Sequence, residues 1–573
     1  MPKLSFSLVE DCIKKTNYNV FEAISIISAS SDRIVLKLNT DTATYNISEL
    51  STFAKKLRSG ELSNSTKKID IQLESRKEAS LYKTVSNDKL VYPVTSYSAP
   101  EKRKENEYQK RIYQSPTTIN LEITEGCNFK CNHCYNPWRE VSSGINSLSR
   151  KQFDYLVEQF KDNGIFHVVL SGGEPFSNFD TLCYALEKLH SNNITTSVNS
   201  NLSLATTNKM KRLIDIGLDH ILTSWYSDND DTTSQITNVN NAQKLVIDGI
   251  KTAVDAGVRV SVNTVVTQHN KHILYQSGKI VAELGAFQFL AYRAVPPVHE
   301  RGNVSDEISL SRQEALESLD TLLRLNKEYG IQVGTLISYP LCLLGDLKKY
   351  SSFVGRGCPS QQGYRFTIHP DGSTHSCVME DLDYGNVFKV GIRSAFQKNR
   401  NNWMDGSYFH NECKGCDYID ICHTGCRMDA LSRTGYMDGQ DPFMTNKDAI
   451  YEPLEYVNDP KILNTLKTMR FVPKKDLRFR EENGFGLINI RWSNIIEADK
   501  DLFELIRGAF VDRRSIPFSD FLNIKKMSLE YLGTLVSKEV FEPLDKFSNF
   551  QRKGVSIDPC TIPGIFKKHI SQQ

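Results

Sequence analysis

Short apolar segments alternate with amphipathic segments in the middle of the chain, from about residue 117 to residue 340. The apolar segments have the length and composition of buried strands and cover residues 117–124, 167–175, 194–201, 220–226, 259–267 and 287–295. Amphipathic segments such as residues 150–164 and 179–193 lie between them and predict helices. This alternation predicts an α/β fold with a parallel sheet and right-handed crossovers, either an open or a closed β/α barrel. Its chemistry should lie at the carboxyl ends of the strands.

The regions before and after this segment show other patterns. Residues 32–47 alternate like a β-hairpin, and residues 48–60 predict a Ser-capped helix that ends at a glycine. After residue 446, two strands within residues 476–492 are followed by three predicted helices, at residues 499–510, 517–526 and 528–544. The segment between Cys342 and residue 446 has little periodicity but many Cys, Gly and His residues, so we expect it to fold around metal.

These changes of pattern predict four parts of the chain. They are a small α+β domain with a charged linker at residues 1–105, the barrel at 106–340, a Cys-rich domain at 341–446, and a winged-helix-like domain at 447–573. The length of 573 residues allows each part its own core.

Composition narrows the class of protein. With 70 basic and 68 acidic residues, the chain lacks the positive field that attracts nucleic acid, so we expect no nucleic-acid partner. No apolar run approaches the ~18 residues of a membrane span, and the charged N-terminal segment does not look like a signal peptide. We therefore expect a cytoplasmic protein that does not bind membranes.

Three cysteines lie close together just after the first predicted barrel strand. Cys127, Cys131 and Cys134 follow the spacing Cys-x₃-Cys-x₂-Cys. A [4Fe–4S] cluster normally has four thiolate ligands, one on each iron. Three thiolates bind only three of the irons and leave the fourth open to a substrate. The alternative is zinc, but a zinc site uses four ligands and this spacing is uncommon for it.

This loop resembles that of the radical S-adenosylmethionine (SAM) enzymes, with His133 at a position that is aromatic in the family. A Gly-Gly-Glu-Pro segment at the end of the second strand strengthens the resemblance, because in the family it binds the methionyl amino group of SAM. The resemblance implies SAM contacts at two further strand ends as well, although each of those residues could equally be an ordinary loop residue. The implied cofactor-binding residues are His133, Gly172, Gly173, Glu174, Pro175, Ser197, Asn199 and Arg293.

The resemblance also implies the fold and the chemistry. It predicts a partial (β/α)₆ barrel that binds a [4Fe–4S] cluster and SAM, and forms a 5′-deoxyadenosyl radical with an electron from a flavodoxin- or ferredoxin-type donor. In such enzymes the protein positions the cofactor and excludes competing reactions. The sequence points to no catalytic side chain.

A second cysteine group resembles the SPASM extension of radical SAM enzymes, which binds two auxiliary [4Fe–4S] clusters. Its pattern is Cys358-x₁₃-Gly372-x₄-Cys377 followed by a Cys-x₂-Cys-x₅-Cys-x₃-Cys run. The resemblance implies a first cluster at Cys358, Cys377 and Cys426, with Cys342 as a further candidate ligand, and a second cluster at Cys413, Cys416 and Cys422. The usual last cysteine is missing, and Met444 stands near its place, so we expect a non-cysteine or open fourth position in the second cluster. A zinc ribbon is the alternative.

Residues 477–510 resemble the peptide-binding chaperone of pyrroloquinoline-quinone biosynthesis, a leader-peptide recognition module. Such modules bind an extended peptide as an added strand. A structural or DNA-binding winged helix is the alternative reading of the same pattern.

Together these features predict a radical SAM/SPASM maturase that modifies a ribosomally made precursor peptide by crosslinking, thioether formation or epimerisation. A sulfatase-maturase role is the alternative among enzymes, but Val378 stands where that branch has an aspartate. An iron–sulfur electron carrier or scaffold is the alternative of another class, and an open cluster argues against it. The oligomeric state and the modified bond are not indicated.

Overall fold

The structure is a computed structural model of the whole chain. It describes residues 113–131, 134, 146–218, 220–295, 308–354, 358–380, 382–404, 406–446, 449–451, 466–491 and 494–524, six single residues between 527 and 541, and the backbone of four strands between residues 3 and 74. The chain divides into two compact units. One contains residues 1–95, 456–469 and 529–556, and the other contains residues 96–455, 470–528 and 557–573.

The smaller unit contains an antiparallel sheet in the order β1-β4-β2-β3. Its strands are β1 (Lys3–Leu4), β2 (Arg33–Leu38), β3 (Asp41–Asn46) and β4 (Ile69–Glu74). The hairpin predicted for residues 32–47 is confirmed, since β2 and β3 pair antiparallel from Arg33 opposite Asn46 to Leu38 opposite Asp41. The helix predicted at residues 48–60 lies outside the described residues.

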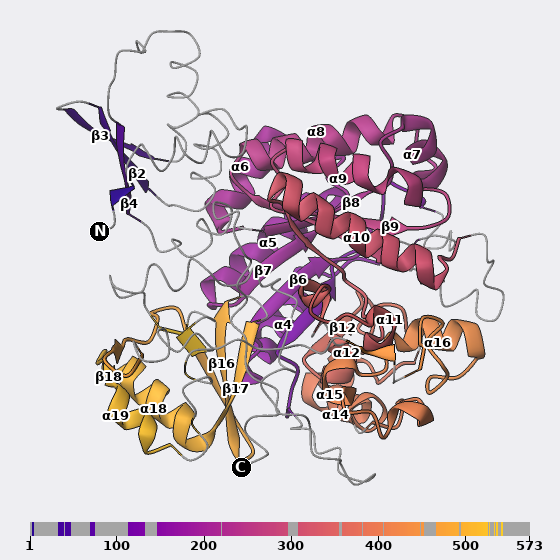
Figure 1. Cartoon of the computed structure of the whole chain (residues 1–573). Helices are drawn as coiled ribbons and strands as arrows, with labels where there is room; N and C mark the ends of the chain where they lie inside the picture. Colours follow the sequence, from indigo (N-terminus) through magenta and orange to yellow (C-terminus); the bar gives the residue numbers. More distant parts are fainter. Residues whose placement is uncertain are drawn as a thin grey trace. The chain divides into compact units, whose positions relative to one another are not determined.

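A nine-stranded sheet forms the centre of the larger unit, in the order β11-β10-β9-β8-β7-β6-β5-β12-β13 (Figure 1). Its strands are β5 (Thr118–Glu122), β6 (His167–Ser171), β7 (Thr195–Asn199), β8 (His220–Trp225), β9 (Arg259–Val266), β10 (Gln288–Arg293), β11 (Gln332–Gly334), β12 (Arg365–Ile368) and β13 (Thr374–His375). The six strands from β5 to β10 lie side by side in chain order and are parallel. All six predicted strands and their parallel arrangement are confirmed.

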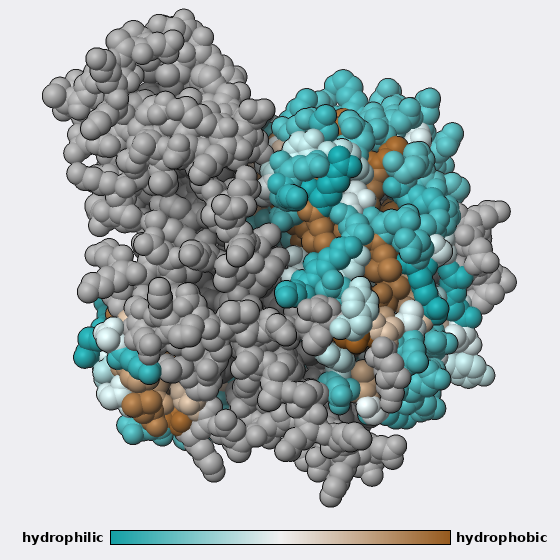
Figure 2. Space-filling model, in the orientation of Figure 1, coloured by the Kyte–Doolittle hydropathy of each residue, from teal (hydrophilic) through white to brown (hydrophobic). Residues whose placement is uncertain are grey.

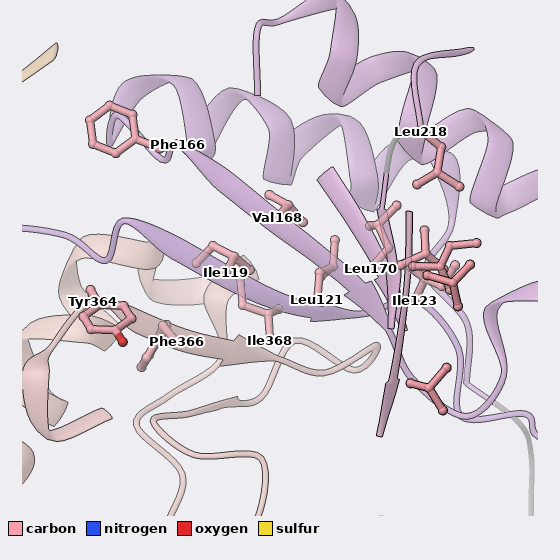
Figure 3. Packing of buried hydrophobic residues seen from close by; sticks show 14 of the residues in the cluster. Ile119, Leu121, Ile123, Phe166, Val168, Leu170, Leu218, Tyr364, Phe366 and Ile368 are labelled. Carbon is pink, nitrogen blue, oxygen red and sulfur yellow. The ribbon is translucent and has the colours of Figure 1, made fainter. Parts of the chain in front are cut away.

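Helices connect these strands and cover one face of the sheet. They are α4 (Arg150–Asp162), α5 (Phe179–Ser191), α6 (Thr207–Ile216), α7 (Asp230–Thr237), α8 (Ala242–Asp255), α9 (Leu274–Glu283) and α10 (Arg312–Tyr329). Alternate strand residues such as Ile119, Leu121, Val168 and Leu170 belong to the apolar core (Figure 3). The intervening residues are often polar: His167 bonds both Thr195 and Ser197 through its ring nitrogens. The period of two residues thus separates an apolar face from a polar face of the sheet.

The Cys-rich segment extends the barrel sheet. Strand β12 pairs in parallel with β5, and β13 turns back antiparallel to β12. Beyond the end of β12, the His369 Nδ1 atom lies 2.9 Å from the Glu122 carboxylate at the end of β5, and both side chains are buried. The segment therefore shares hydrogen bonds with the strand that leads into the first cysteine loop.

A three-stranded antiparallel sheet follows, in the order β15-β16-β17. Strands β15 (Arg478–Glu482) and β16 (Phe485–Arg491) were predicted, whereas β17 (Asn494–Asp499) is a further strand that directly precedes helix α18 (Lys500–Val511). A short pair, β14 (Arg470–Phe471) with β18 (Ile516–Pro517), and helix α19 (Phe518–Leu522) complete the described part of this region. Most of the helix predicted at residues 528–544 lies outside the described residues.

Two arginines attach this sheet to the amino-terminal ends of the barrel strands. Arg478 donates to the carbonyl oxygens of Phe166 and Asn193, just before β6 and β7. Arg480 donates to the carbonyl oxygens of Ser115, Pro116, Asn163 and Gly164, and pairs with Glu482 at 2.7 Å. The attachment is therefore at the opposite end of the strands from the cysteine loop.

The visible surface over helices α8 to α10 is mainly hydrophilic, and hydrophobic atoms gather over α18 and α19 (Figure 2). Val511 and Leu522 are exposed there. In the part of the chain that the structure describes, no helix has the length and apolar character needed to cross a membrane.

Candidate functional site

The loop with the three cysteines begins directly after β5 and is held from several sides. The Phe129 amide donates to the Cys127 sulfur at 3.4 Å, and the Cys134 amide donates to the Cys131 carbonyl at 3.1 Å. The Cys131 thiol lies 3.7 Å from the hydroxyl of Tyr226, which follows β8. The loop thus lies over the carboxyl ends of the barrel strands, where the sequence placed the chemistry.

The three thiols influence one another electrostatically. Shielding from water by the surrounding chain, together with Glu174 and the thiols of Cys131 and Cys134, raises the pKa of Cys127 to about 12. Three neighbouring thiolates repel one another in such a place unless a cation compensates their charge. Iron in a [4Fe–4S] cluster supplies that charge, so the donor set fits the cluster.

Gly172 and Gly173 pack against the start of this cysteine loop. The two backbones are hydrogen-bonded to each other: the Gly173 amide donates to the Thr124 carbonyl and the Glu174 amide to the Gly126 carbonyl, each at 2.7 Å. A Cβ on Gly172 would overlap the Thr124 carbonyl oxygen, and one on Gly173 would overlap that of Gly126. Only glycine allows this close approach of two backbones.

Glu174 is fully buried and its carboxylate is occupied by donors of the chain itself. It accepts hydrogen bonds from the Phe176 amide at 2.9 Å, the Ser200 hydroxyl at 2.7 Å and the Asn201 amide at 2.7 Å. Burial raises its pKa. The side chain therefore joins the end of β6 to the turn after β7, and Pro175 begins the short 3₁₀ helix η3 (Pro175–Asn178) that follows.

The other residues expected to contact SAM lie in different surroundings. The Ser197 hydroxyl bonds the His167 ring at 3.1 Å in the middle of the sheet, whereas Asn199 ends β7 and is half-buried. His133 lies outside the described residues. Of these three, only Asn199 is described at the carboxyl end of a strand.

Arg293 turns from the end of β10 toward the Cys-rich segment. Its guanidinium pairs with Asp429 at 2.8 Å and with Asp441 at 2.6 Å, and all three side chains are buried. The rings of Tyr339 and Phe443 lie 4.9 and 4.4 Å from the guanidinium carbon. This arrangement makes Arg293 a link between barrel and extension, and the expected SAM contact stays a prediction.

Two tyrosines near the cysteine loop were not singled out from the sequence. Burial and the nearby Cys131 thiol raise the pKa of Tyr226, and burial raises that of Tyr292, with Cys134 adding to the rise. Tyr226 follows β8 and Tyr292 lies in β10. Their position at predicted strand ends was the only feature of the sequence that could have singled them out. Aromatic residues at such positions are usually ordinary core residues, so this feature is weak.

Cys358, Cys377 and Cys426 form one group in the extension. The Ser360 hydroxyl donates to the Ser376 carbonyl at 2.7 Å, and the Gln361 side-chain amide donates to the Gly425 carbonyl at 3.3 Å, so residues near the three cysteines touch. Burial raises the pKa of Cys377, and the thiols of Cys358 and Cys426 add to the rise. These are the cysteines that the resemblance assigns to the first auxiliary cluster, and their role as its ligands stays a prediction.

Cys342 lies with the other group, Cys413, Cys416 and Cys422. Burial raises the pKa of Cys413 to about 12, and the thiols of Cys422, Cys416 and Cys342 contribute to the rise. The amide of Leu341 donates to the Cys422 sulfur at 3.4 Å. This position differs from the expectation, which put Cys342 beside Cys358.

Among the described residues, no three His, Cys, Asp or Glu side chains converge on a point that one metal ion could occupy. A [4Fe–4S] cluster binds each thiolate through a different iron, so its ligands do not need to converge on one point. The absence of a one-ion site among the described residues therefore does not argue against clusters at the three cysteine groups.

Comparison with known proteins identifies the class. Residues 121–272 match the family model described as the Radical SAM superfamily. The chain therefore contains a radical SAM domain, whose cofactors are a [4Fe–4S] cluster and SAM. The matched residues run from β5 through β9 and include the cysteine loop and the Gly-Gly-Glu-Pro segment.

Particular relatives narrow the comparison. The chain is 24% identical over 347 residues to a PqqA peptide cyclase of Granulibacter bethesdensis, covering 57% of this chain and 87% of that protein. It is 23% identical over 352 residues to an AdoMet-dependent heme synthase of Nitratidesulfovibrio vulgaris, covering 58% and 94%. The structure of Streptococcus suis SuiB bound to precursor peptide SuiA aligns with a TM-score of 0.46 at 14% identity over 72% of this chain and 98% of that one.

Proposed function

We propose that this protein is a radical SAM maturase that modifies a ribosomally made precursor peptide. The observation that carries the proposal is the meeting of Cys127, Cys131 and Cys134 at the carboxyl ends of the barrel strands, inside a radical SAM domain. Bound there, the cluster and SAM supply a 5′-deoxyadenosyl radical, which removes a hydrogen atom from the substrate.

The chain's own residues hold and shield this site. Cys127, Cys131 and Cys134 are the proposed iron ligands. Gly172 and Gly173 keep the backbone after β6 against the cysteine loop, and Glu174 fixes the turn after β7. The buried Tyr226 and the half-buried Tyr292 lie near the cysteine loop, where their rings would limit access of water.

Two features support a peptide substrate. PqqA peptide cyclases are among the relatives, and a separate antiparallel sheet is attached to the barrel in this chain. Such a sheet offers an edge to which an extended leader peptide can add as a strand. Residues 447–573 are the proposed leader-binding part, residues 341–446 the proposed auxiliary-cluster domain, and residues 1–105 a further domain without an assigned role.

The proposal also includes the protein's surroundings. Cys342, Cys358, Cys377, Cys413, Cys416, Cys422 and Cys426 are the proposed ligands of auxiliary clusters. Thiols of this kind persist in a reducing compartment, so we propose a cytoplasmic location and a flavodoxin- or ferredoxin-type electron donor.

The test is anaerobic reconstitution followed by reaction with SAM and a reductant. The reconstituted protein should release 5′-deoxyadenosine, and a short precursor peptide encoded beside its gene should change in mass and donate its hydrogen to that product. The Cys127→Ala/Cys131→Ala/Cys134→Ala variant is the control and should release none.

Three outcomes would contradict the proposal in different ways. Release of 5′-deoxyadenosine by the triple variant would remove the assigned radical site. Hydrogen transfer from a tetrapyrrole instead of a peptide would favour the chemistry of the heme-synthase relatives. Iron binding without any SAM cleavage would favour the electron-carrier alternative.

A further inference from the structure

The second auxiliary cysteine group contains four cysteines in the structure, although the sequence run supplies only three. Cys413, Cys416 and Cys422 come from one segment, between the 3₁₀ helix η7 (Asn411–Cys413) and helix α15 (Ile419–Cys422). Cys342 comes from the four-residue helix α11 (Leu341–Leu344), about 70 residues earlier in the chain. A distant segment therefore brings a fourth thiol to the group.

Contacts on both sides fix Cys342 in this place. The Thr445 amide donates to the Cys342 sulfur at 3.3 Å, and the Thr445 hydroxyl donates to the Cys342 carbonyl at 2.6 Å. The neighbouring Leu341 amide donates to the Cys422 sulfur at 3.4 Å. Amide-to-sulfur hydrogen bonds of this kind stabilise metal-bound thiolates and tune the cluster.

Met444 occupies the other side of the same group. Its sulfur lies 3.8 Å from the Cys413 sulfur, and it directly precedes the threonine that holds Cys342. The family pattern has a cysteine near residue 444, and because this chain has Met444 there, the sequence predicted a non-cysteine or open fourth position. Cys342 reaches the group of Cys413, Cys416 and Cys422 from helix α11. Its thiol can therefore serve as the fourth ligand in place of the cysteine that this chain lacks near residue 444.

We propose that Cys342 is the fourth thiolate ligand of the cluster held by Cys413, Cys416 and Cys422. The cluster at Cys358, Cys377 and Cys426 then has three cysteine ligands among the described residues. This inference rests on the proposed presence of auxiliary clusters and assigns their ligands.

Cys342 does not share the contacts of the other group. Residues near Cys358, Cys377 and Cys426 touch through Ser360 with Ser376 and Gln361 with Gly425. The Cys342 sulfur accepts from the Thr445 amide instead, and the adjacent Met444 sulfur lies 3.8 Å from the Cys413 sulfur. Leu341, next to Cys342, donates to the Cys422 sulfur. The two sets of contacts separate the ligands into a group of three and a group of four.

Iron counting in paired variants tests the assignment. The experiment uses the full chain with Cys127→Ala/Cys131→Ala/Cys134→Ala, so that only auxiliary clusters remain, at about eight Fe per chain. Cys342→Ala should lower this to about four Fe per chain, as Cys413→Ala does. Adding Cys342→Ala to Cys413→Ala should remove no more iron, whereas adding it to Cys377→Ala should remove both clusters. The opposite pattern, or full iron in Cys342→Ala when Cys413→Ala has lost about four Fe, overturns the proposal.

Met444 provides a matched pair of variants. Met444→Leu keeps the volume without a sulfur ligand, and should retain about eight Fe per chain. Cys342→Ala/Met444→Cys returns a thiol from the other side of the group and should regain the lost cluster. Loss of one cluster in Met444→Leu alone would make the thioether the fourth ligand and overturn the assignment of Cys342.

A spectroscopic measurement covers the case in which Cys342→Ala does not fold. Cys342→Ser keeps the size and the Thr445 contact, and electron paramagnetic resonance shows which reduced cluster it alters. Cys413→Ser and Cys377→Ser identify the signals of the second and the first auxiliary cluster. If Cys342→Ser alters the same signal as Cys413→Ser, the proposal is supported. If it alters the same signal as Cys377→Ser, the proposal is overturned. These experiments measure iron content and cluster spectra, not peptide modification. Their result therefore does not depend on whether the proposed substrate is right. Less than about four Fe in the parent chain would contradict the auxiliary clusters themselves.

Discussion

Gly173 lies where two backbones meet, between the turn after β6 and the loop that carries Cys127. Its amide donates to the Thr124 carbonyl at 2.7 Å, and no space remains for a Cβ beside Gly126. The neighbouring atoms belong to the backbone, so they cannot yield as a flexible side chain would. Any substitution must displace the start of the cysteine loop.

We therefore predict that Gly173→Ala lowers the rate of 5′-deoxyadenosine formation by about 100-fold, because a displacement near 1 Å has effects of that size on a reacting geometry. Product chromatography after reduction with SAM measures it. Gly508→Ala is the matched control, since a Cβ at Gly508 in helix α18 meets no atom within 4 Å, and its rate should equal that of the wild type. Equal rates in both variants would contradict the role of this contact.

The buried pair of Glu122 and His369 gives the fold a pH dependence. Burial lowers the pKa of His369, but the Glu122 carboxylate at 2.9 Å, with Asp371 and Glu125 further away, raises it, and the net shift is upward. The pKa of a free histidine is about 6.5. A raised pKa in the folded state contributes stability that is complete below that value and is lost as the pH rises through the folded pKa.

Glu122→Gln should therefore lower the denaturation midpoint at pH 6, and the difference from the wild type should shrink toward pH 8.5. Chemical denaturation followed by fluorescence at several pH values measures it. Glu283→Gln, at an exposed residue 3.9 Å from Lys279, is the control and should show no such trend. A difference that stays constant between these pH values would contradict the pairing.

Residue spacing indicated the first cysteine group and the family resemblance indicated the two auxiliary groups, because ligands that lie close together in the sequence leave a pattern. It could not predict the partners of Arg293, since Asp429 and Asp441 are far away in the chain and resemble any other acidic residues. For the same reason it put Cys342 beside Cys358. Only the folded backbone brings Thr445 to the Cys342 sulfur.

At the scale of secondary structure, the six strands from β5 to β10 were predictable because each is a buried apolar run flanked by an amphipathic helix. Strand β12 was not, since Arg365–Ile368 is short and its pairing with β5 joins residues almost 250 positions apart. Strand β17 follows β16 after a brief turn, so its pattern merges with that of its neighbour. Local patterns thus give the elements, while long-range pairing gives the register.

Strand β15 is also the attachment of the carboxyl-terminal sheet, and Arg480 is its main contact. The buried guanidinium donates to four carbonyl oxygens and pairs with Glu482. Arg480→Ala leaves this glutamate unpaired and should lower the free energy of unfolding by about 3 kcal/mol. Chemical denaturation measures it. Arg507→Ala, whose pairs with Glu481 and Glu504 at 3.8 Å are exposed, should cost less than about 1 kcal/mol. Equal effects would contradict the attachment.

In the whole molecule, this attachment changes how leader binding is best tested. Truncation near residue 470 removes β15 and with it the arginines that bind the barrel. A truncated chain would lose stability as well as any bound leader. Variants of the precursor peptide leave the enzyme intact and separate the two effects.

The attachment lies at the amino-terminal ends of β5, β6 and β7, while the cysteine loop follows their carboxyl ends. A strand of five residues is about 17 Å long, and a covering helix adds about 10 Å. A leader bound to the three-stranded sheet must therefore be joined to the modified residue by at least about eight extended residues. We predict that precursors with shorter spacers bind equally well by calorimetry but are modified at least tenfold more slowly, and normal modification with a five-residue spacer would contradict this. A minimum spacer length between the bound leader and the modified residue would mean that, among chemically identical side chains of a precursor, only those far enough from the leader are modified.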